Sequence, residues 1–370
     1  MSAMIPVTPM KIATILGTRP EIIKLSALIP LLDSDKRIEH ILIHTGQHYD
    51  YGMDAVFFEE LKLRKPHYLL NVGSHSQGKQ TGLMLEKIED ILVKKNPVLV
   101  IVQGDTNSTL AGALAAAKLG IAIVHVEAGC RSFNRSMPEE INRVITDAVS
   151  SILIAPDDNA VANLKKEGVF GEIINLGSTA FDAAVRIQKF VGIVFNTLRK
   201  DFGIEEGNYL LLTLHRAENT TPERLASIMN TLNEIAKDIP IIFPIHPRTL
   251  KIAQENNVDL SNIHVRNPQS YLKFMSLLAH ARFCITDSGG IQEEALVFNV
   301  PCLIPRNETE WMRLVDAGKN VLLGTDPDKI KQGILSLWDD SARLQQIKHI
   351  KVDYPRHVSE KIIDIIAHHG

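Results

Sequence analysis

Cysteine is scarce in this chain, and a large net charge is absent. The 370 residues include three cysteines, Cys130, Cys284 and Cys302, whose odd number and wide separation argue against a disulfide framework and favour a reducing compartment. Lys and Arg number 40 against 43 Asp and Glu, which gives a formal net charge of −3. The broad positive field of a protein that binds nucleic acid or a membrane surface is therefore missing, and a small anionic ligand fits this balance better.

Long hydrophobic runs and metal-ligand patterns are lacking as well. No apolar run approaches the roughly 18 residues that a membrane-spanning helix needs, and the first ten residues lack the charged-then-apolar pattern of a secretion signal. The cysteines do not have metal-site spacing, and His44 and His48 flank a Thr-Gly turn rather than sharing a helix face. These features predict a soluble, cytoplasmic protein without a metal site.

What the chain does contain is a regular alternation of short apolar runs with longer amphipathic stretches. At 45% hydrophobic residues over this length, two domains are expected. Strands that alternate with helices predict an α/β fold in which each domain is doubly wound and Rossmann-like, with a parallel sheet covered on both faces. The apolar runs of the expected strands are Ile12–Leu16, His40–His44, Val98–Val102, Ile121–Val126 and Ile152–Ala155, then Tyr209–Leu214, Ile241–Ile245, Ile263–Val265, Phe283–Thr286 and Pro301–Ile304.

The boundary between the two domains is expected in the stretch from about Gly177 to Asn208, which is helical and charged and has no clear strand. We expect an N-terminal domain at 1–180 and a C-terminal domain at 181–356, with a last short helix at 357–370 as a candidate to pack back on the first domain. Open α/β sheets bind ligands at the carboxyl ends of their strands, so the predicted site is a central cleft that the two domains face.

The stretch Gly17-Thr-Arg-Pro-Glu-Ile-Ile-Lys24 follows the first apolar run and opens one helical pattern over Pro20–Leu32. Its glycine permits a tight turn, its proline suits a first helical position, and the amides of the first turn favour negative charge. Arg19 and Lys24 add two cations, so a phosphate group is the expected guest. An ordinary strand-to-helix connection with two solvated basic residues is the alternative.

Carboxylates follow two later strands and open one helix of the first domain. Asp105 lies just beyond Val98–Val102 and has a helix cap as its alternative role. Glu127 ends the next strand, needs partners such as His125 or Arg131, and has a buried structural ion pair as its alternative. Glu139, with its neighbour Glu140, opens the helix after Pro138, where acidic residues usually complement the helix dipole.

Two clusters in the second domain complete the set of candidates. His215 ends the strand that restarts the alternating pattern, and a histidine opposite several carboxylates supplies groups of tunable pKa for acid–base chemistry, although a structural role is the alternative. Ser288, Gly289 and Gly290 expose backbone amides at a helix start, which makes a second phosphate cradle. Glu294, one turn into that helix, is placed to accept hydrogen bonds from a ribose diol, although a capping role is the alternative.

Taken together and in this order, the motifs resemble those of the non-hydrolysing UDP-N-acetylglucosamine 2-epimerases, over nearly the whole chain. The matching segments are Gly17-Thr-Arg-Pro-Glu, Gly46-Gln-His48, Gly104-Asp-Thr106, His125-Val-Glu-Ala-Gly129, Pro138-Glu-Glu140, His215-Arg216 and Asp287-Ser-Gly-Gly-Ile-Gln-Glu-Glu294.

The resemblance implies a GT-B architecture, a homodimer and a reaction that needs neither metal nor nicotinamide cofactor. The substrate would be a UDP-sugar: UDP leaves UDP-GlcNAc by anti elimination, 2-acetamidoglucal remains, and re-addition gives the UDP-ManNAc used in surface polysaccharides. Asp105, Glu127, Glu139 and His215 would be catalytic, with the three carboxylates relaying the proton at carbon 2.

For substrate binding, the resemblance assigns the diphosphate to Arg19, Lys24 and Ser288–Gly290, helped by His215. Gln269 and Phe274 would line the uracil pocket, and Glu294 would hold the ribose. Three alternatives stay open: an epimerase of another UDP-2-acetamido sugar such as a diacetamido uronic acid, a GT-B glycosyltransferase, and a UDP-sugar sensor without activity. The transferase does not explain three carboxylates on the first domain, and the sensor does not explain a complete set of acid–base groups.

Overall fold

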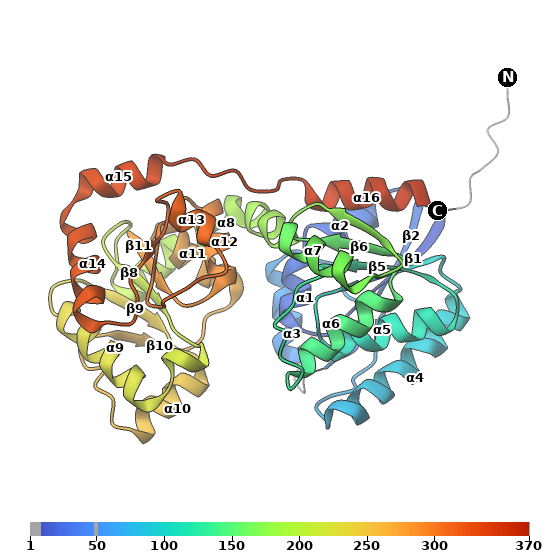
Figure 1. Cartoon of the computed structure of the whole chain (residues 1–370), viewed down its shortest axis with the longest axis horizontal. Coiled ribbons are helices and arrows are strands. Elements are labelled where there is room, and N and C mark those ends of the chain that lie inside the picture. Colours follow the sequence, from blue (N-terminus) through green and yellow to red (C-terminus); the bar gives the residue numbers. More distant parts are fainter. Residues whose placement is uncertain (1–8, 48–50, 370) are drawn as a thin grey trace. The chain divides into compact units, whose positions relative to one another are not determined.

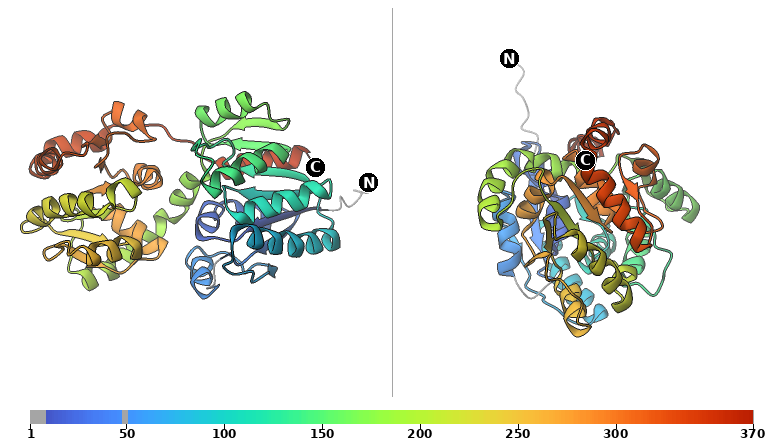
Figure 2. Two further views of the ribbon diagram at one scale, coloured as in Figure 1. Left: turned by 60° about the horizontal axis from the view of Figure 1, so that its bottom comes forward. Right: turned by 90° about the vertical axis from the view of Figure 1, so that its left-hand side faces the viewer.

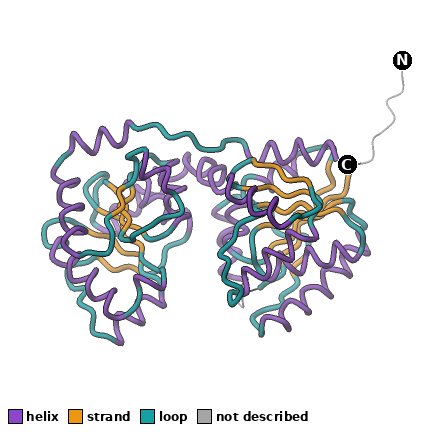
Figure 3. Tube along the Cα trace, viewed as in Figure 1, coloured by secondary structure: helices purple, strands orange, loops and turns teal. Residues whose placement is uncertain are grey.

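The computed structural model describes residues 9–47 and 51–369, and it divides into two compact units (Figure 1). The first unit takes the described residues of Met1–Ala183 and Tyr354–Gly370, and the second takes Ala184–Asp353. In each unit, strands form the inner layer and helices lie outside them (Figure 3). In the described part of the chain, no helix combines the length and the apolar character needed to cross a membrane.

The first unit contains a sheet of seven strands, all paired in parallel. Strand order reverses next to β1, because β2 and β3 lie on one side of β1 and β4 to β7 lie on the other, as in a doubly wound fold. The strands, in spatial order, are β3 (Tyr68–Leu69), β2 (Ile38–His44), β1 (Met10–Leu16), β4 (Leu99–Gln103), β5 (Ala122–Val126), β6 (Ile152–Ala155) and β7 (Glu172–Asn175).

Helices cover both faces of this sheet (Figure 2). On one face, apolar side chains of α4 and α5 pack on β1 and β4, as Met84, Ala111 and Ile15 illustrate. The C-terminal helix α16 packs against α2 and so belongs to the first unit. The helices are α1 (Arg19–Lys24), α2 (Leu28–Ser34), α3 (Tyr51–Glu60), α4 (Gln77–Lys95), α5 (Asn107–Lys118), α6 (Pro138–Val149), α7 (Asp158–Glu167) and α16 (Val358–His369), and α8 (Thr179–Phe202) leads into the second unit.

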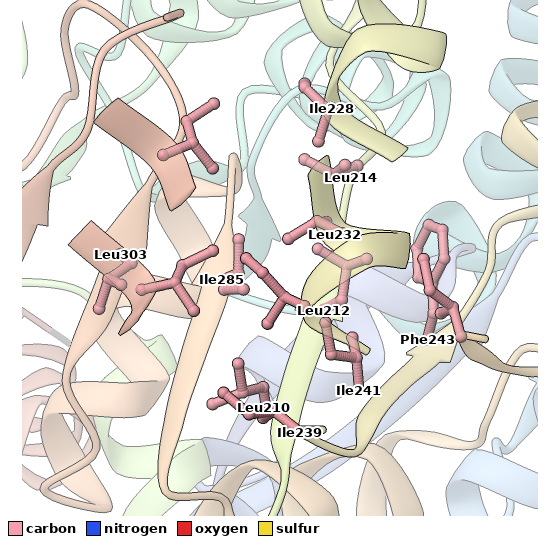
Figure 4. Close-up of a cluster of buried hydrophobic side chains, with 14 of the residues drawn as sticks. Leu210, Leu212, Leu214, Ile228, Leu232, Ile239, Ile241, Phe243, Ile285 and Leu303 are labelled. Atoms are coloured by element: carbon pink, nitrogen blue, oxygen red, sulfur yellow. The ribbon is translucent and has the colours of Figure 1, made fainter. Parts of the chain in front are cut away.

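The second unit repeats the plan with six parallel strands. Its core is mostly aliphatic: Leu212, Ile241 and Ile285 of neighbouring strands meet Ile228 and Leu232 of α9 (Figure 4). The strands, in spatial order, are β10 (His264–Arg266), β9 (Ile241–Pro244), β8 (Leu210–Thr213), β11 (Phe283–Thr286), β12 (Cys302–Ile304) and β13 (Val321–Leu322). The helices are η1 (Ala217–Asn219), α9 (Pro222–Ile235), α10 (Pro247–Glu255), α11 (Tyr271–His280), α12 (Gly289–Val297), α13 (Met312–Asp316), α14 (Pro327–Asp339) and α15 (Ser341–His349).

The expected α/β architecture is confirmed, and every apolar run expected as a strand overlaps one. Three strands were not predicted, namely β3, β7 and β13; each has only two to four residues and is partly buried, so it is too short to give a clear strand pattern. The single helix expected over Pro20–Leu32 is wrong, because α1 ends at Lys24 and α2 begins at Leu28. Pro30 has no amide hydrogen to donate to the carbonyl of Ser26 and its ring crowds that carbonyl, which favours a break at this point.

Candidate functional site

The first unit has a cavity of about 250 Å³ at the carboxyl ends of its central strands. It brings together Asp105, from the turn after β4, and Glu139, from the first turn of α6, two residues that are 34 positions apart in the sequence. The starts of α1, α5 and α6 meet there, so several helix N-termini contribute to the wall. The residues that line the cavity are Thr18, Pro20, Gln47, Gln77, Asp105, Thr106, Asn107, Pro138, Glu139 and Asn142.

Asp105 is held by helix α6 and does not cap α5. The N-cap of α5 is Thr106, whose hydroxyl accepts a hydrogen bond from the Thr109 amide, so the alternative reading of Asp105 as a cap is wrong. The Asp105 carboxylate forms an ion pair with the Arg143 guanidinium, and the Asn142 side chain donates to the Asp105 carbonyl at 2.9 Å. Burial acts to lower the pKa of Arg143, but the negative charge of Asp105 acts in the opposite direction and the pKa is raised.

Glu127 stands directly after β5 in a left-handed backbone conformation, with φ of 68°. This region is uncommon for a residue with a long side chain and is found most often where a site requires it. The Lys24 ammonium donates to both carboxylate oxygens of Glu127, at 2.7 and 2.5 Å, and the Gln103 amide donates to one of them at 2.8 Å. The expected partners were wrong, because His125 and Arg131 pair with Asp147 instead.

The opening motif holds a carboxylate of its own where a phosphate was expected. The amides of Gly17 and Thr18 donate to one oxygen of Glu21, at 2.9 and 2.8 Å, and the hydroxyls of Thr106 and Thr109 donate to the other. Burial of this side chain raises the pKa of Glu21 to about 7, although these hydrogen bonds act in the opposite direction. The amides of Gly17 and Thr18 are therefore engaged by Glu21, as part of a capping box at the start of α1, and the assignment of Arg19 and Lys24 to a phosphate stays a prediction.

The two carboxylates at the start of α6 differ in their surroundings. Glu139 is exposed, whereas Glu140 is 3% exposed and accepts hydrogen bonds from the amides of Ser132 and Phe133 at 2.8 and 3.0 Å. Burial opposes ionisation of Glu140, yet these bonds and Arg143 lower its pKa. Glu140 therefore orders the loop before α6, and Glu139 is the carboxylate presented to the cavity.

His215 of the second unit is anchored through a buried carboxylate. Asp287, which follows β11, is fully buried and accepts hydrogen bonds from the amides of His215 and Arg216 and from the side chain of Asn219. The His215 ring lies 3.1 Å from the same carboxylate and is 46% exposed. Burial acts to raise the pKa of Asp287, but His215 and the other donors lower it. The imidazole is thus held at the ends of two adjacent strands with one side open.

The cradle of Ser288, Gly289 and Gly290 forms the start of α12. Ser288 is the N-cap, and its hydroxyl accepts from the Ile291 amide. A methyl group placed on Gly289 would lie 3.3 Å from a carboxylate oxygen of Glu310, so an acidic side chain stands beside this helix start. Glu310 forms ion pairs with Arg216 and Arg306, at 2.7 and 3.0 Å.

The three remaining candidates belong to α11, α12 and the loop before α11. Gln269 is half-buried and its side chain donates to the Asn267 carbonyl at 2.7 Å, and Phe274 is half-buried on α11. Glu294 lies on α12, which packs against α11, and burial together with the Glu294 charge raises the pKa of Tyr271 of α11. His48 of the matching segment Gly46-Gln-His48 lies outside the described residues.

Comparison with known proteins decides the family. The model of the family described as UDP-N-acetylglucosamine 2-epimerase matches residues 31–367. The chain belongs to the UDP-N-acetylglucosamine 2-epimerase family. It is 49% identical to the UDP-N-acetylglucosamine 2-epimerase of Methanococcus maripaludis over 330 residues, covering 86% of this chain and 89% of that one.

Two further relatives bear on the site. The chain is 44% identical to the UDP-2,3-diacetamido-2,3-dideoxy-D-glucuronate 2-epimerase of Pseudomonas aeruginosa, covering 87% of this chain and 90% of that one. Among solved structures, it matches the UDP-GlcNAc 2-epimerase of Methanocaldococcus jannaschii in complex with UDP-GlcNAc and UDP, with a TM-score of 0.81, 43% identity and coverage of 98% and 100%. The resemblance to the epimerase family and the expected GT-B class of fold are confirmed.

Two side chains that shape this site, Arg143 and Asp147, were not among the sequence candidates, whereas Glu139 was. Glu139, Arg143 and Asp147 are spaced four residues apart and therefore lie on one face of α6. Arg143 pairs with Asp105, and Asp147 pairs with His125. This row of charged residues along a partly buried helix is the sequence signal that could have identified Arg143 and Asp147, because buried charges need partners.

Proposed function

We propose that this protein is an isomerase that interconverts UDP-GlcNAc and UDP-ManNAc by elimination and re-addition of UDP. A carboxylate takes the proton from carbon 2, the C1–O bond breaks with its electron pair leaving on UDP, and a C1–C2 double bond forms. A proton then returns to the opposite face of carbon 2 while a UDP oxygen re-forms the bond to carbon 1. Membership of the 2-epimerase family supports this reaction.

The observation that carries the proposal is the placement of carboxylates in the first unit. Asp105 and Glu139 line one cavity. Glu127 has an uncommon backbone conformation, and the Lys24 ammonium holds its carboxylate. Proton removal from one face and delivery to the other requires at least two acid–base groups, and the developing positive charge at carbon 1 favours a carboxylate nearby. We assign Asp105, Glu127 and Glu139 to these steps.

The second unit supplies the groups suited to the leaving nucleotide. The amides at Ser288–Gly290 open a helix of nine residues, and His215 stands on a buried carboxylate with one side exposed. Together with Arg19 and Lys24, they are assigned to the charge that develops on the diphosphate as the C1–O bond breaks. Gln269 and Phe274 are assigned to the uracil, and Glu294 to the ribose.

The identity of the sugar is the part of the proposal for which a second candidate exists, a UDP-diacetamido-glucuronate in place of UDP-GlcNAc. The 44% identity to a diacetamido-glucuronate 2-epimerase is close to the 49% identity to a UDP-GlcNAc 2-epimerase. Both reactions invert carbon 2 beside an acetamido group, so the same carboxylates serve either one. The assay must therefore include both substrates.

The proposed setting is the cytoplasm, where the product serves polysaccharide synthesis, and the proposed assembly is a homodimer. The three cysteines are free thiols, two of them buried, which suits a reducing compartment. Closed two-fold symmetry is the commonest form of soluble oligomer. Light scattering coupled to size-exclusion chromatography tests the assembly, because a mass near the 41.1 kDa of one chain would contradict the dimer.

Proton NMR in heavy water tests the proposed reaction. The purified protein is incubated with UDP-GlcNAc, and in parallel with the diacetamido-glucuronate analogue, without added metal or NAD. Appearance of UDP-ManNAc with deuterium at carbon 2 supports the proposal. Turnover of the analogue alone moves the assignment to that sugar, and inertness of both contradicts an epimerase.

A further inference from the structure

Asp147 of α6 is a fully buried carboxylate that receives donors from three other residues. One oxygen lies 2.6 Å from the His125 Nδ1 atom. The other accepts from the Gly129 amide at 3.0 Å and lies 2.7 Å from the Arg131 guanidinium. Buried charges persist in proteins where they are paired and hydrogen-bonded, as here, and they fix the groups around them.

These donors flank Glu127 on both sides along the chain. His125 is the last residue but one of β5, and Gly129 stands two residues after Glu127. Both Glu127 and Gly129 have positive φ, of 68° and 81°, so the turn that carries the carboxylate has a demanding backbone path. Asp147 ties the entry and the exit of this turn to one helix.

The same network reaches Asp105. The other ring nitrogen of His125, Nε2, donates to the Gly104 carbonyl at 2.8 Å, and Gly104 directly precedes Asp105. From the same helix, Arg143 pairs with the Asp105 carboxylate and Asn142 donates to its carbonyl. Helix α6 therefore holds the turns after β4 and β5, while its own first turn supplies Glu139.

We propose that Asp147 is a positioning residue, which acts through His125 and the Gly129 amide to set Asp105 and Glu127 relative to each other. The inference rests on the proposed epimerase function and deepens it. Proton transfer at carbon 2 needs a carboxylate on each face of one carbon, and a displacement of about 1 Å can cost on the order of a hundredfold in rate. Neither Asp147 nor His125 lines the cavity, so their contribution is to geometry.

The test replaces Asp147 with asparagine, which keeps the shape but turns one acceptor oxygen into a donor. That donor then faces either His125 or the Gly129 amide, and the turn loses a hydrogen bond. We expect kcat to fall about a hundredfold, with KM and the calorimetric affinity for UDP changed less than threefold. A purely structural role would lower the fraction of active protein and leave the rate per active site unchanged, so active sites are counted by UDP titration.

Two further variants make the result decisive. Glu167→Gln is the matched control, because Glu167 reaches the network only through Arg131, at 2.8 and 2.6 Å, on its outer side; kcat should stay within twofold. His125→Gln, alone and combined with Asp147→Asn, measures coupling: if Asp147 acts through His125, the double variant loses little more rate than either single one.

The outcomes separate this inference from the proposed function. If the wild-type protein epimerises a UDP-2-acetamido sugar and Asp147→Asn keeps its kcat, the positioning role is wrong while the function stands. If the wild-type protein epimerises neither sugar, the function is wrong and the inference with it. If Asp147→Asn does not fold, His125→Gln carries the test, since it leaves the carboxylate with Gly129 and Arg131; an unchanged kcat then overturns the proposal.

Discussion

The Lys24 ammonium donates hydrogen bonds to both carboxylate oxygens of Glu127, at 2.7 and 2.5 Å. The two residues are 103 positions apart, and they meet because α1 follows β1 while Glu127 follows β5 at the same edge of one sheet. Their side chains are 28% and 24% exposed, so the pair is only partly screened by water. The lysine thus holds the Glu127 carboxylate as well as being a candidate for the diphosphate.

Replacing Lys24 with methionine separates these two roles. We expect turnover to fall about ten- to a hundredfold, the range for losing a hydrogen bond to a charged group, and UDP affinity to fall by a smaller factor, because the ammonium is shared between Glu127 and the proposed diphosphate contact. Progress curves and UDP calorimetry measure the two quantities. Lys94→Met, an exposed lysine of α4, is the control. A large loss of UDP affinity with little loss of kcat would return Lys24 to the diphosphate alone.

Arg19 is expected to behave in the opposite way. Arg19 lies in the first turn of α1, and its guanidinium is 5.7 Å from the centre of the Phe57 ring. Arg19→Ala should weaken UDP binding about tenfold, as for the loss of one charge-assisted contact to phosphate, with a smaller effect on kcat at saturation. Arg37→Ala, which removes a surface pair with Asp35, serves as control. Unchanged calorimetric affinity would make Arg19 structural.

Asp105 is expected to be needed for chemistry and not for UDP binding. Asp105→Asn keeps the volume and removes the acid–base group, so turnover should fall about 10²- to 10⁴-fold while UDP affinity is nearly unchanged. Deuterium incorporation at carbon 2 provides a second reading of the same step. Glu86→Gln on the exposed side of α4 is the matched control. Retained turnover in Asp105→Asn would remove this residue from the mechanism.

Glu21 should make stability fall as pH rises towards neutrality. Its pKa is about 7 in the folded protein against an ordinary 4.5, so the folded state holds a proton that the unfolded state releases between these values. The free energy of unfolding should therefore drop from about pH 4.5 to pH 7 and level off above, by about 3 kcal/mol from this group. Urea unfolding across pH 5 to 8 measures the slope. Glu21→Gln should flatten it, and an identical slope in both proteins would contradict the assignment.

Gly17 is required by a close approach of neighbouring side chains. A methyl group there would lie 1.9 Å from the Thr45 hydroxyl oxygen and 2.2 Å from that of Ser108, so Gly17→Ala should destabilise the fold by about 1–3 kcal/mol. Gly82→Ala, in α4 with nothing within 4 Å, should be neutral or stabilise by up to about 1 kcal/mol. Thermal unfolding of the pair makes the comparison, and equal shifts would refute the steric explanation.

The sequence by itself determined the fold class, because buried parallel strands such as β4 and β11 must be continuous apolar runs and the helices between them must be amphipathic. It also indicated the turns that carry Asp105, Glu127, His215 and Ser288, since polar residues after buried strands are not needed for packing. Short edge strands such as β7 could not be predicted from the sequence, because a few partly exposed residues give no clear hydrophobic pattern.

Only the tertiary structure decided which charges meet. Lys24 could have served any anion, and His125 or Arg131 could have served Glu127, since sequence spacing sets no distance between separate strand ends. The strand order placed β1, β4 and β5 side by side, so that Lys24 reaches Glu127, Arg143 reaches Asp105 and Asp147 takes the remaining donors. The pairing of buried charges depends on packing in three dimensions. The local sequence pattern could therefore identify the charged residues but not their partners.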